Sequence, residues 1–259
     1  MTRYEAAKHI ALLCGGIIKE KFGASFAARE KSPGDYVTEA DLESERRAQE
    51  EIMRLFPGDG ILSEEAGNSR SSGNLRIWII DPLDGTNNFV RHIPFFCSSV
   101  AVCENGRPVA AAVYDPVHHE LFHCQRGKGA FLWDAPLRVA AQSDPQKMVC
   151  YLGWVPGLRT KDEFFALTRR IRRSGCAFRR LGSAALAHAY IAAGRMDGAF
   201  SSGLHSWDLA AGCLLIEEAG GRVADLRGEA PDMDASQLQI IAGSPRAADF
   251  LARDLEVPR

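Results

Sequence analysis

The sequence has little net charge and no apolar run long enough to cross a membrane. Of its 259 residues, 31 are Lys or Arg and 33 are Asp or Glu, which gives a formal net charge of −2. This balance argues against a dedicated binder of nucleic acid or of membrane surfaces, although it excludes neither. The longest apolar stretch, residues 10–18, falls short of the roughly 20 residues that a spanning helix needs, and no signal-peptide cleavage pattern follows it. We therefore expect no membrane contact.

Closely spaced cysteine pairs are also missing. The seven cysteines are scattered along the chain and form no CxxC motif: Cys14, Cys97, Cys103, Cys124, Cys150, Cys176 and Cys213. An odd, scattered set is typical of reduced, mostly buried thiols in a cytoplasmic protein, and not of a disulfide framework or a zinc site. The sequence also lacks internal repeats and low-complexity segments. Its length suffices for one large domain or two smaller ones.

In the first half, the spacing of apolar residues predicts two helices packed on a largely antiparallel sheet. Residues 2–29 have helical spacing, and Thr38 and Asp41 open a second helix. Residues 31–36 and the polar segment 67–74 are predicted as loops. Strands are predicted at residues 61–63, 77–80, 97–103, 109–114, 120–124 and 130–132.

After a boundary at residues 138–144, the chain alternates predicted strands with predicted helices, which is typical of an α/β unit. The strands are placed at residues 149–152, 197–201, 223–225 and 239–242, and the helices at residues 164–173, 184–193 and 209–219. We therefore predict an α+β protein. Residues 1–140 would form one half and residues 141–259 a smaller α/β half.

The most informative stretch is residues 78–89, Trp-Ile-Ile-Asp-Pro-Leu-Asp-Gly-Thr-Asn-Asn-Phe. Asp81 and Asp84 follow a predicted strand, and three-residue spacing within one turn would place both carboxylates on one side. Gly85 lets the backbone approach a ligand, and the N–H and hydroxyl of Thr86 can face an anion. A capping role would explain one Asp but not both, whereas oxygen ligands suit Mg²⁺ that is shared with a substrate phosphate. The stretch therefore predicts a metal–phosphate site.

Further acidic residues are uninformative when each is taken alone. Glu64 and Glu65 follow a predicted strand and could be solvated loop residues. Asp41 could be a first-turn acid favoured by the helix dipole, and Asp208, which follows Trp207, could be a helix N-cap. Their significance comes from the set that they form with Asp81 and Asp84.

With these motifs the chain resembles, over nearly its full length, the inositol monophosphatase family of Mg²⁺-dependent, lithium-sensitive phosphatases. The resemblance is carried by residues 61–65, 78–89 and 207–212, with support from residues 31–41 and 179–184. It implies a layered αβαβα sugar-phosphatase fold, a homodimer and two to three Mg²⁺ ions per active site. It also implies inositol-1-monophosphatase-like hydrolysis of inositol monophosphate, or of a related small sugar or polyol phosphate, by metal-activated water.

The resemblance assigns roles to individual residues. Glu64, Asp81 and the Leu83 carbonyl would hold one Mg²⁺; Asp81, Asp84 and Asp208 would hold a second; and a third, weaker ion would depend on Glu64. The catalytic residues would be Glu64, Thr86 and Asp41, with Asp41 backing Thr86 as it orients the attacking water. Substrate would be bound by Lys31, Gly85, Thr86, Gly182, Ser183, Ala184, Ser201 and Asp208.

The chain departs from the family pattern at Ser201. Many members have a Glu there that contacts the sugar ring, and a hydroxyl cannot accept hydrogen bonds from two ring hydroxyls as a carboxylate can. Selectivity for inositol is therefore expected to be weaker, which leaves histidinol phosphate and sugar bisphosphates as alternative substrates.

A different class of function also stays open. Some bacterial members of the family act mainly as RNA- or transcription-complex-binding proteins. The residues that would carry such a role are the basic runs Arg169–Arg173 and Arg179–Arg180. The other explanation for the first run is a solvated helix face.

Overall fold

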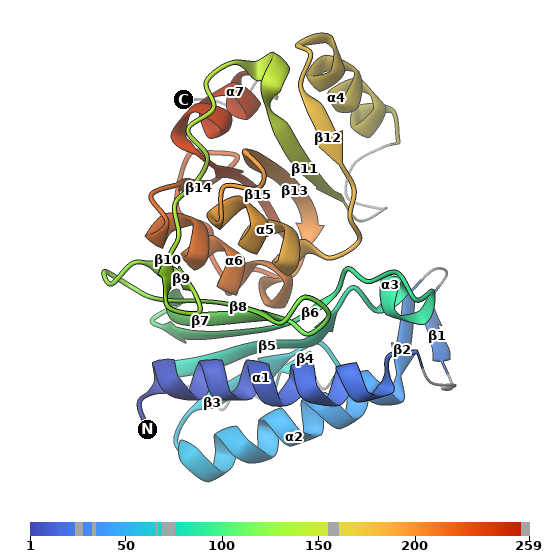
Figure 1. Cartoon of the computed structure of the whole chain (residues 1–259), viewed down its shortest axis with the longest axis vertical. Helices are drawn as coiled ribbons and strands as arrows, with labels where there is room; N and C mark the ends of the chain where they lie inside the picture. Colours follow the sequence, from blue (N-terminus) through green and yellow to red (C-terminus); the bar gives the residue numbers. More distant parts are fainter. Residues whose placement is uncertain (24–27, 33–34, 66, 69–75, 155–160, 255–259) are drawn as a thin grey trace.

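A computed structural model describes residues 1–23, 28–32, 35–65, 67–68, 76–154 and 161–254. Its elements stack in five layers, seen edge-on in Figure 1. Helices α1 and α2 cover one face of an eight-stranded sheet, and α5 and α6 lie between that sheet and a five-stranded sheet. Helices α4 and α7 cover the outer side of the smaller sheet. The predicted αβαβα layering is confirmed.

Helices α1 (Arg3–Lys21) and α2 (Glu39–Leu55) both begin with a capping box. In α2 the predicted start at Thr38 and Asp41 is confirmed: Asp41 accepts hydrogen bonds from the Thr38 backbone N–H at 2.8 Å and from its hydroxyl at 2.5 Å. Each box satisfies backbone donors that the first helical turn leaves without partners.

The predicted extension of the first helix to residue 29 is wrong, because α1 ends at Lys21. The loop predicted over residues 31–36 is wrong at residues 31–32 and 35–36, which lie in strands, and residues 33–34 lie outside the described chain. Directly after the end of α1, the ring of Phe22 packs against Phe89 and Phe96 with ring centroids 5.6 and 4.7 Å away. The chain then forms an antiparallel pair, β1 (Ala28–Ser32) and β2 (Asp35–Thr38), which leads directly into α2. Strand pairing therefore places Lys31, which was expected in a loop.

The eight-stranded sheet has the order β10-β9-β8-β7-β6-β5-β3-β4 and is antiparallel except for the parallel pair β3–β5. Its predicted meander is confirmed, including the turn at Asn105 and Gly106, where both residues have positive φ. Of the polar segment expected as a loop, residues 67–68 form β4 and residues 69–74 lie outside the described chain. The strands are β3 (Gly60–Ser63), β4 (Gly67–Asn68), β5 (Arg76–Asp84), β6 (Cys97–Glu104), β7 (Arg107–Asp115), β8 (Glu120–Gln125), β9 (Ala130–Leu132) and β10 (Ala135–Pro136).

The five-stranded sheet has the order β12-β11-β13-β15-β14. Strand β11 is parallel to β12 and β13, whereas β15 is antiparallel to its neighbours. The strands are β11 (Val149–Trp154), β12 (Ala177–Arg179), β13 (Gly198–Leu204), β14 (Arg222–Asp225) and β15 (Leu238–Gly243). The helices are α3 (Thr86–Val90), the 3₁₀ helix η1 (Pro145–Lys147), α4 (Lys161–Arg173), α5 (Ala184–Ala192), α6 (Ser206–Glu218) and α7 (Pro245–Asp254). Strand β12 and helix α7 were not predicted from the sequence.

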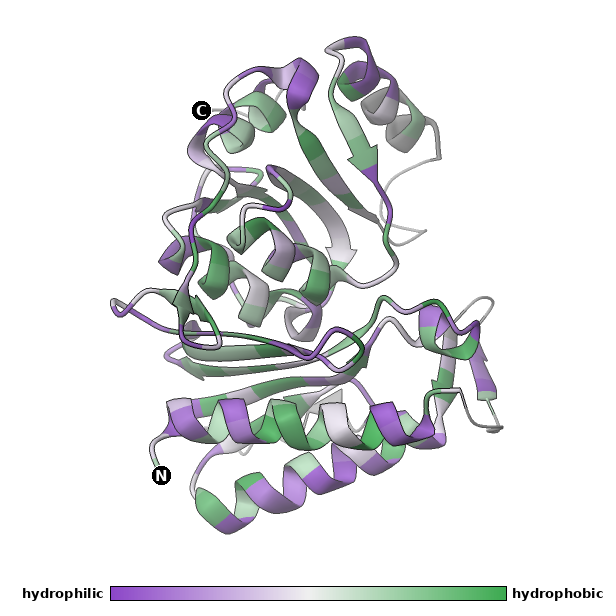
Figure 2. Ribbon diagram, viewed as in Figure 1, coloured by the Kyte–Doolittle hydropathy of each residue, from purple (hydrophilic) through white to green (hydrophobic). Residues whose placement is uncertain are grey.

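The two central helices lack a polar face, because both of their sides are covered. In α5 every residue except Tyr190 is buried, and Figure 2 colours the helix green or pale throughout, whereas α2 also carries purple. A helix that is apolar all round belongs between two apolar layers. Small residues let α5 and α6 approach closely, since a Cβ on Gly212 would collide with His188. Residues from both halves of the chain consequently share one core.

All seven cysteines are buried and none forms a disulfide, so the expectation of buried thiols is confirmed. In the described part of the chain, no helix combines the length and apolar character that crossing a membrane requires.

The packing of α1 on β7 predicts opposite effects for two adjacent glycines. A Cβ on Gly15 would lie 2.6 Å from Tyr114 Cε1, whereas a Cβ on Gly16 would meet nothing within 4 Å. Gly15→Ala should lower the free energy of unfolding by about 1–3 kcal/mol through overpacking. Gly16→Ala, the matched control, should raise it by up to about 1 kcal/mol through better helix propensity. Urea denaturation measures both, and equal effects would contradict this account of the interface.

Candidate active site

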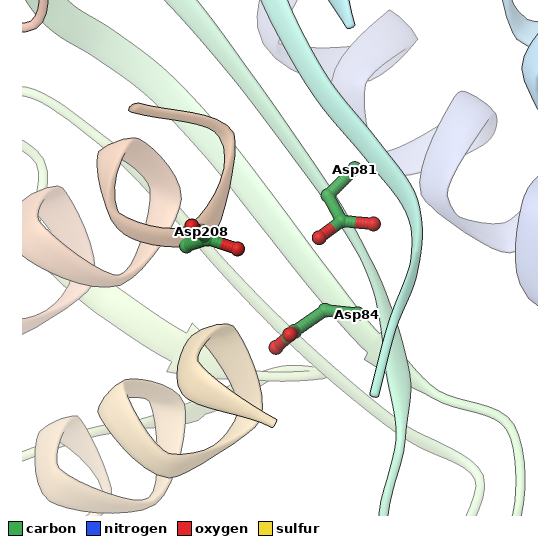
Figure 3. Close-up of side chains that lie close together, drawn as sticks. All are labelled: Asp81, Asp84 and Asp208. Carbon is green, nitrogen blue, oxygen red and sulfur yellow. The ribbon is translucent and has the colours of Figure 1, made fainter. Parts of the chain in front are cut away.

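Three aspartates from two distant parts of the chain converge between β5 and the start of α6; Asp81 and Asp84 are buried and Asp208 is half-buried. Figure 3 shows Asp81 and Asp84, both on β5, facing Asp208 on α6. One carboxylate oxygen from each residue lies within 4.8 Å of the corresponding oxygens of the other two. Asp81 and Asp84 are 1% and 7% exposed. The structure therefore brings together three of the predicted metal ligands.

An irregularity in β5 places two of these carboxylates on the same side. Residues three apart in a regular strand point to opposite faces. Here Asp81 pairs with Ser99 and Asp84 with Cys97, so β5 uses one residue more than β6 over this interval. Such a bulge restores a common direction. The predicted turn after Asp81 is therefore wrong, because the strand continues to Asp84, but the two carboxylates do share a side.

Asp84 is held by the beginning of α5. Its Oδ2 accepts hydrogen bonds of 2.6 Å from the Ser183 hydroxyl and from the Ala185 backbone N–H. A helix N-terminus presents backbone N–H groups and a partial positive charge, both of which favour a carboxylate. These bonds fix the orientation of Asp84. They also use the hydroxyl of Ser183, which is fully buried.

Asp208 lies in the first turn of α6, but it is not the N-cap. That position belongs to His205, whose backbone N–H donates to Asp208 Oδ2 at 2.7 Å. The His205 ring stacks on Trp207 with centroids 4.4 Å apart. The capping bond thus aims the Asp208 carboxylate at β5.

The Thr86 hydroxyl has a defined orientation. It lies 2.9 Å from Asp41 Oδ1 and 3.1 Å from the Leu83 carbonyl oxygen, and both of these atoms can only accept from it. Asp41 is itself fixed by its capping bonds to Thr38. The hydroxyl hydrogen therefore points into the protein. The oxygen lone pairs stay available to accept a hydrogen bond from water.

Two glycines allow the backbone to approach closely beside Asp84. Gly85 has a φ of +101°, and a Cβ there would lie 3.2 Å from the carbonyl oxygens of Gly182 and Phe95. Gly182 has a φ of +81° and faces Asn88, whose amide donates to the Leu181 carbonyl at 2.7 Å. These contacts hold the loop before α5 against α3. A side chain at either glycine would disturb that arrangement.

Glu64 lies beside the three aspartates but is bound differently. Its Oε1 accepts from Lys31 Nζ at 2.9 Å, and the same ammonium lies 2.7 Å from Glu65 Oε1. Burial raises the pKa of Glu64 to about 7, although Lys31 opposes the rise. The charge of Glu64, when present, in turn raises the pKa of Asp81.

The negative charges of neighbouring acidic residues raise one another's pKa values. Burial, followed by the charges of Glu64 and Asp84, raises the pKa of Asp81 well above its usual range. The pKa of Asp208 rises for the same kinds of reason, and burial raises that of Asp41 to about 6. Several buried carboxylates require compensating positive charge. Because every donor is a hard oxygen, the group fits Mg²⁺.

Among the predicted substrate contacts, Ser201 is fully buried on β13. Its hydroxyl lies 3.4 Å from His188 Nε2. Neither His188 nor its neighbour Tyr151 was predicted from the sequence as a site residue. The hydrogen bond from Ser183 to Asp84 was not predicted either. An aromatic residue in a strand and a histidine in an Ala-rich helix give no local signal of a site, because their proximity arises only from packing.

Known proteins of one family match this chain over most of its length. The model of the inositol monophosphatase family matches residues 2–257. The chain is 41% identical to the Nus factor SuhB of Xylella fastidiosa, over 86% of this chain and 82% of that protein. It is 40% identical to the inositol-1-monophosphatase of Mesorhizobium japonicum, over 96% and 94%. The crystal structure of the extragenic suppressor protein suhB from Bartonella henselae superposes with a TM-score of 0.91 at 35% identity and covers 97% of each chain.

The raised pKa values predict that the metal-free protein is destabilised by its own site. A carboxyl group with a raised pKa in the folded state favours folding while protonated and loses that contribution as pH rises from about 4 to 7. In EDTA at pH 7.5, Asp81→Asn should therefore unfold at a higher temperature than wild type, because it removes a carboxylate whose charged form is disfavoured in the folded state. The difference should shrink as pH falls towards 5. Mg²⁺ should raise the melting temperature of wild type more than that of the variant.

Asp59→Asn is the control of opposite sign. Burial alone would raise the pKa of Asp59, but hydrogen bonds from Arg3 and Trp78 lower it overall. Asp59 therefore stabilises the fold when charged, and Asp59→Asn should destabilise it at pH 7.5. A metal-free Asp81→Asn that melts below wild type at pH 7.5 would contradict the proposed charge repulsion.

Proposed function

The chain belongs to the inositol monophosphatase family, and we propose that it is a Mg²⁺-dependent phosphatase of inositol monophosphate or a related small sugar or polyol phosphate. The observation that carries the proposal is the meeting of Asp81, Asp84 and Asp208 within 4.8 Å. A cluster of buried carboxylates beside two positive-φ glycines suits a metal-bound phosphate better than it suits any purely structural role.

Each residue has a role in this proposal. Asp81, Asp84, Asp208, Glu64 and the Leu83 carbonyl would hold two to three Mg²⁺ ions. Bound Mg²⁺ would supply positive charge opposite the phosphoryl oxygens and would lower the pKa of a water molecule.

The remaining catalytic groups would position water and phosphate. Thr86 accepts a hydrogen bond from the attacking water, because Asp41 and the Leu83 carbonyl hold its own hydrogen. Gly85 and Gly182 let the phosphate approach the backbone, and Lys31 adds positive charge at the edge of the site. No protein nucleophile is required, since phosphoryl transfer depends mainly on positioning and electrostatics.

Three further properties follow from the family and remain part of the proposal. Li⁺ should inhibit by taking the position of the metal held by Asp81, Asp84 and Asp208. The protein should form a homodimer and work in the cytoplasm. Histidinol phosphate and sugar bisphosphates stay as alternative substrates, which a panel of phosphomonoesters with and without Mg²⁺ would distinguish.

Asp84→Asn should reduce kcat/KM for glycerol 2-phosphate by at least about 100-fold, because it removes a metal-binding charge without changing the size of the side chain. Wild-type activity should vanish in EDTA and return with Mg²⁺. Asp249→Asn, which changes an exposed acid paired with Arg222 on the far side of the smaller sheet, should leave turnover unchanged. Turnover by Asp84→Asn near that of wild type would refute the assignment of the site.

A second candidate function is binding of RNA or of a transcription complex. Helix α4 ends in an arginine-rich turn in which Arg169, Arg172 and Arg173 are exposed around the buried Ile171. Relatives named Nus factor SuhB, with up to 41% identity, support the same candidate. Exposed arginines on one helix end can contact phosphates, although the net charge of −2 supplies no general attraction.

The test is the salt dependence of binding to single-stranded RNA. The double variant Arg172→Ala/Arg173→Ala should lower the slope of log K against log salt by about 1.4, since each phosphate contact contributes about 0.7. Its phosphatase activity should be unchanged. The control Arg222→Ala/Arg253→Ala should bind RNA like wild type, and a wild-type protein that binds no RNA at low salt would rule out this function.

A further inference from the structure

Tyr151 lies in the wall beside the acidic cluster. Its ring runs along β11 over Gly153, where a Cβ would come within 2.7 Å of Tyr151 Cε1 and 3.2 Å of its hydroxyl oxygen. Gly153 pairs with Ser201 of the parallel strand β13. Both strands run towards the end of the sheet at which β13 leads into α6 and Asp208. The phenol end of Tyr151 is therefore directed towards the site, and only glycine at position 153 leaves room for it.

The neighbours of Tyr151 form a small neutral polar group. Its ring meets His188 edge to face, with centroids 5.9 Å apart. His188 Nδ1 lies 2.6 Å from the Ala184 carbonyl oxygen, which can only accept, so Nδ1 carries the hydrogen. Nε2 is then the acceptor for the Ser201 hydroxyl at 3.4 Å. Burial lowers the pKa of His188 to about 4, so the ring is neutral at physiological pH.

In this arrangement the Ser201 hydroxyl is engaged by His188, whereas the Tyr151 hydroxyl can still bind a ligand. The hydroxyl hydrogen of Ser201 points to His188, and Ser201 has no exposed surface. Within the described residues, the Tyr151 hydroxyl has no hydrogen-bond partner. Among the same residues, Ser44 Oγ is the one fully buried side-chain oxygen or nitrogen without a partner, so the Tyr151 oxygen is not fully buried. The Tyr151 oxygen must therefore still reach solvent. Burial and the charges of Asp84 and Asp208 raise the pKa of Tyr151, so the phenol stays protonated.

We propose that Tyr151 is the specificity-determining residue of this site: its neutral phenol hydroxyl hydrogen-bonds a hydroxyl group on the alcohol part of the substrate. Tyr151 thereby supplies the contact that the missing carboxylate at Ser201 would make. The wall of Tyr151, His188 and Ser201 carries no charge, so it favours neutral polyol phosphates over alcohols that bear a cation, such as histidinol phosphate. This inference rests on the proposed phosphatase function.

The test compares two substrates that share a carbon skeleton. Glycerol 2-phosphate has two hydroxyl groups beside the phosphoester, and isopropyl phosphate has none. In wild type, the ratio of kcat/KM for glycerol 2-phosphate to kcat/KM for isopropyl phosphate should exceed one. In Tyr151→Phe the ratio should fall about 2- to 12-fold, the range for loss of one neutral hydrogen bond. The Mg²⁺ concentration for half-maximal rate should not change. Tyr114→Phe, which removes a phenol from the larger sheet, is the matched control and should keep the wild-type ratio.

The outcomes separate the inference from the proposed function. If wild type hydrolyses neither substrate with Mg²⁺, the proposed function fails. If wild type is active and Mg²⁺-dependent but Tyr151→Phe keeps its ratio, Tyr151 is a core residue and the inference is overturned. The same holds if Ser201→Ala lowers the ratio while Tyr151→Phe does not, because the contact then belongs to Ser201. A wild type that prefers histidinol phosphate to glycerol 2-phosphate would overturn the assignment to neutral alcohols.

Discussion

The mutual repulsion of Asp81, Asp84 and Asp208 is the constraint on which the rest of the structure depends. Buried carboxylates a few ångströms apart are costly without a cation, and the raised pKa values express that cost. The fold must therefore hold them in place against repulsion. It does so through the bulge of β5, in the eight-stranded sheet, on one side and through the first turns of α5 and α6 on the other. Both helices are packed into the shared core. Neither helix can move its N-terminal end away from the carboxylates without disrupting that core.

Helix starts are the means by which this fold makes acidic residues tolerable. Asp41, Asp84 and Asp208 each accept hydrogen bonds at the beginning of a different helix, where backbone donors and the dipole favour negative charge. Two of the three are within their own helix, so their spacing is visible in the sequence. Asp84 instead accepts hydrogen bonds from the start of α5, about a hundred residues away in the sequence. Capping of a helix by a carboxylate therefore occurs here both within one helix and between distant parts of the chain.

This difference explains which features could be predicted from the sequence. The capping box of Asp41, the meander and the helix carrying Asp208 depend on local spacing, and their predictions are confirmed. The family resemblance supplied the layering, which local spacing does not contain. The pairing of β1 with β2 was missed because Pro33 and Gly34 look like a loop. The bulge at Asp81–Asp84 was taken for a turn, since both place residues i and i+3 on one side. The wall of Tyr151 and His188 was missed because each residue suits an ordinary core position.

The separation between the metal-binding residues and this wall has a consequence for selectivity. The carboxylates are fixed by β5 and by two helix starts, whereas Tyr151 and Ser201 lie on β11 and β13 and contact His188. None of these wall residues donates a hydrogen bond to a carboxylate of the cluster in the described structure. A change in the wall can therefore alter which alcohol is accommodated without altering how the acidic residues are held. Replacing Ser201 with a larger acid, however, would add a charge at a fully buried position and would crowd the space over Gly153 that the Tyr151 ring occupies. The residues at positions 201 and 151 must consequently be considered together, since the Tyr151 ring and the Ser201 hydroxyl both border the space that Gly153 leaves open.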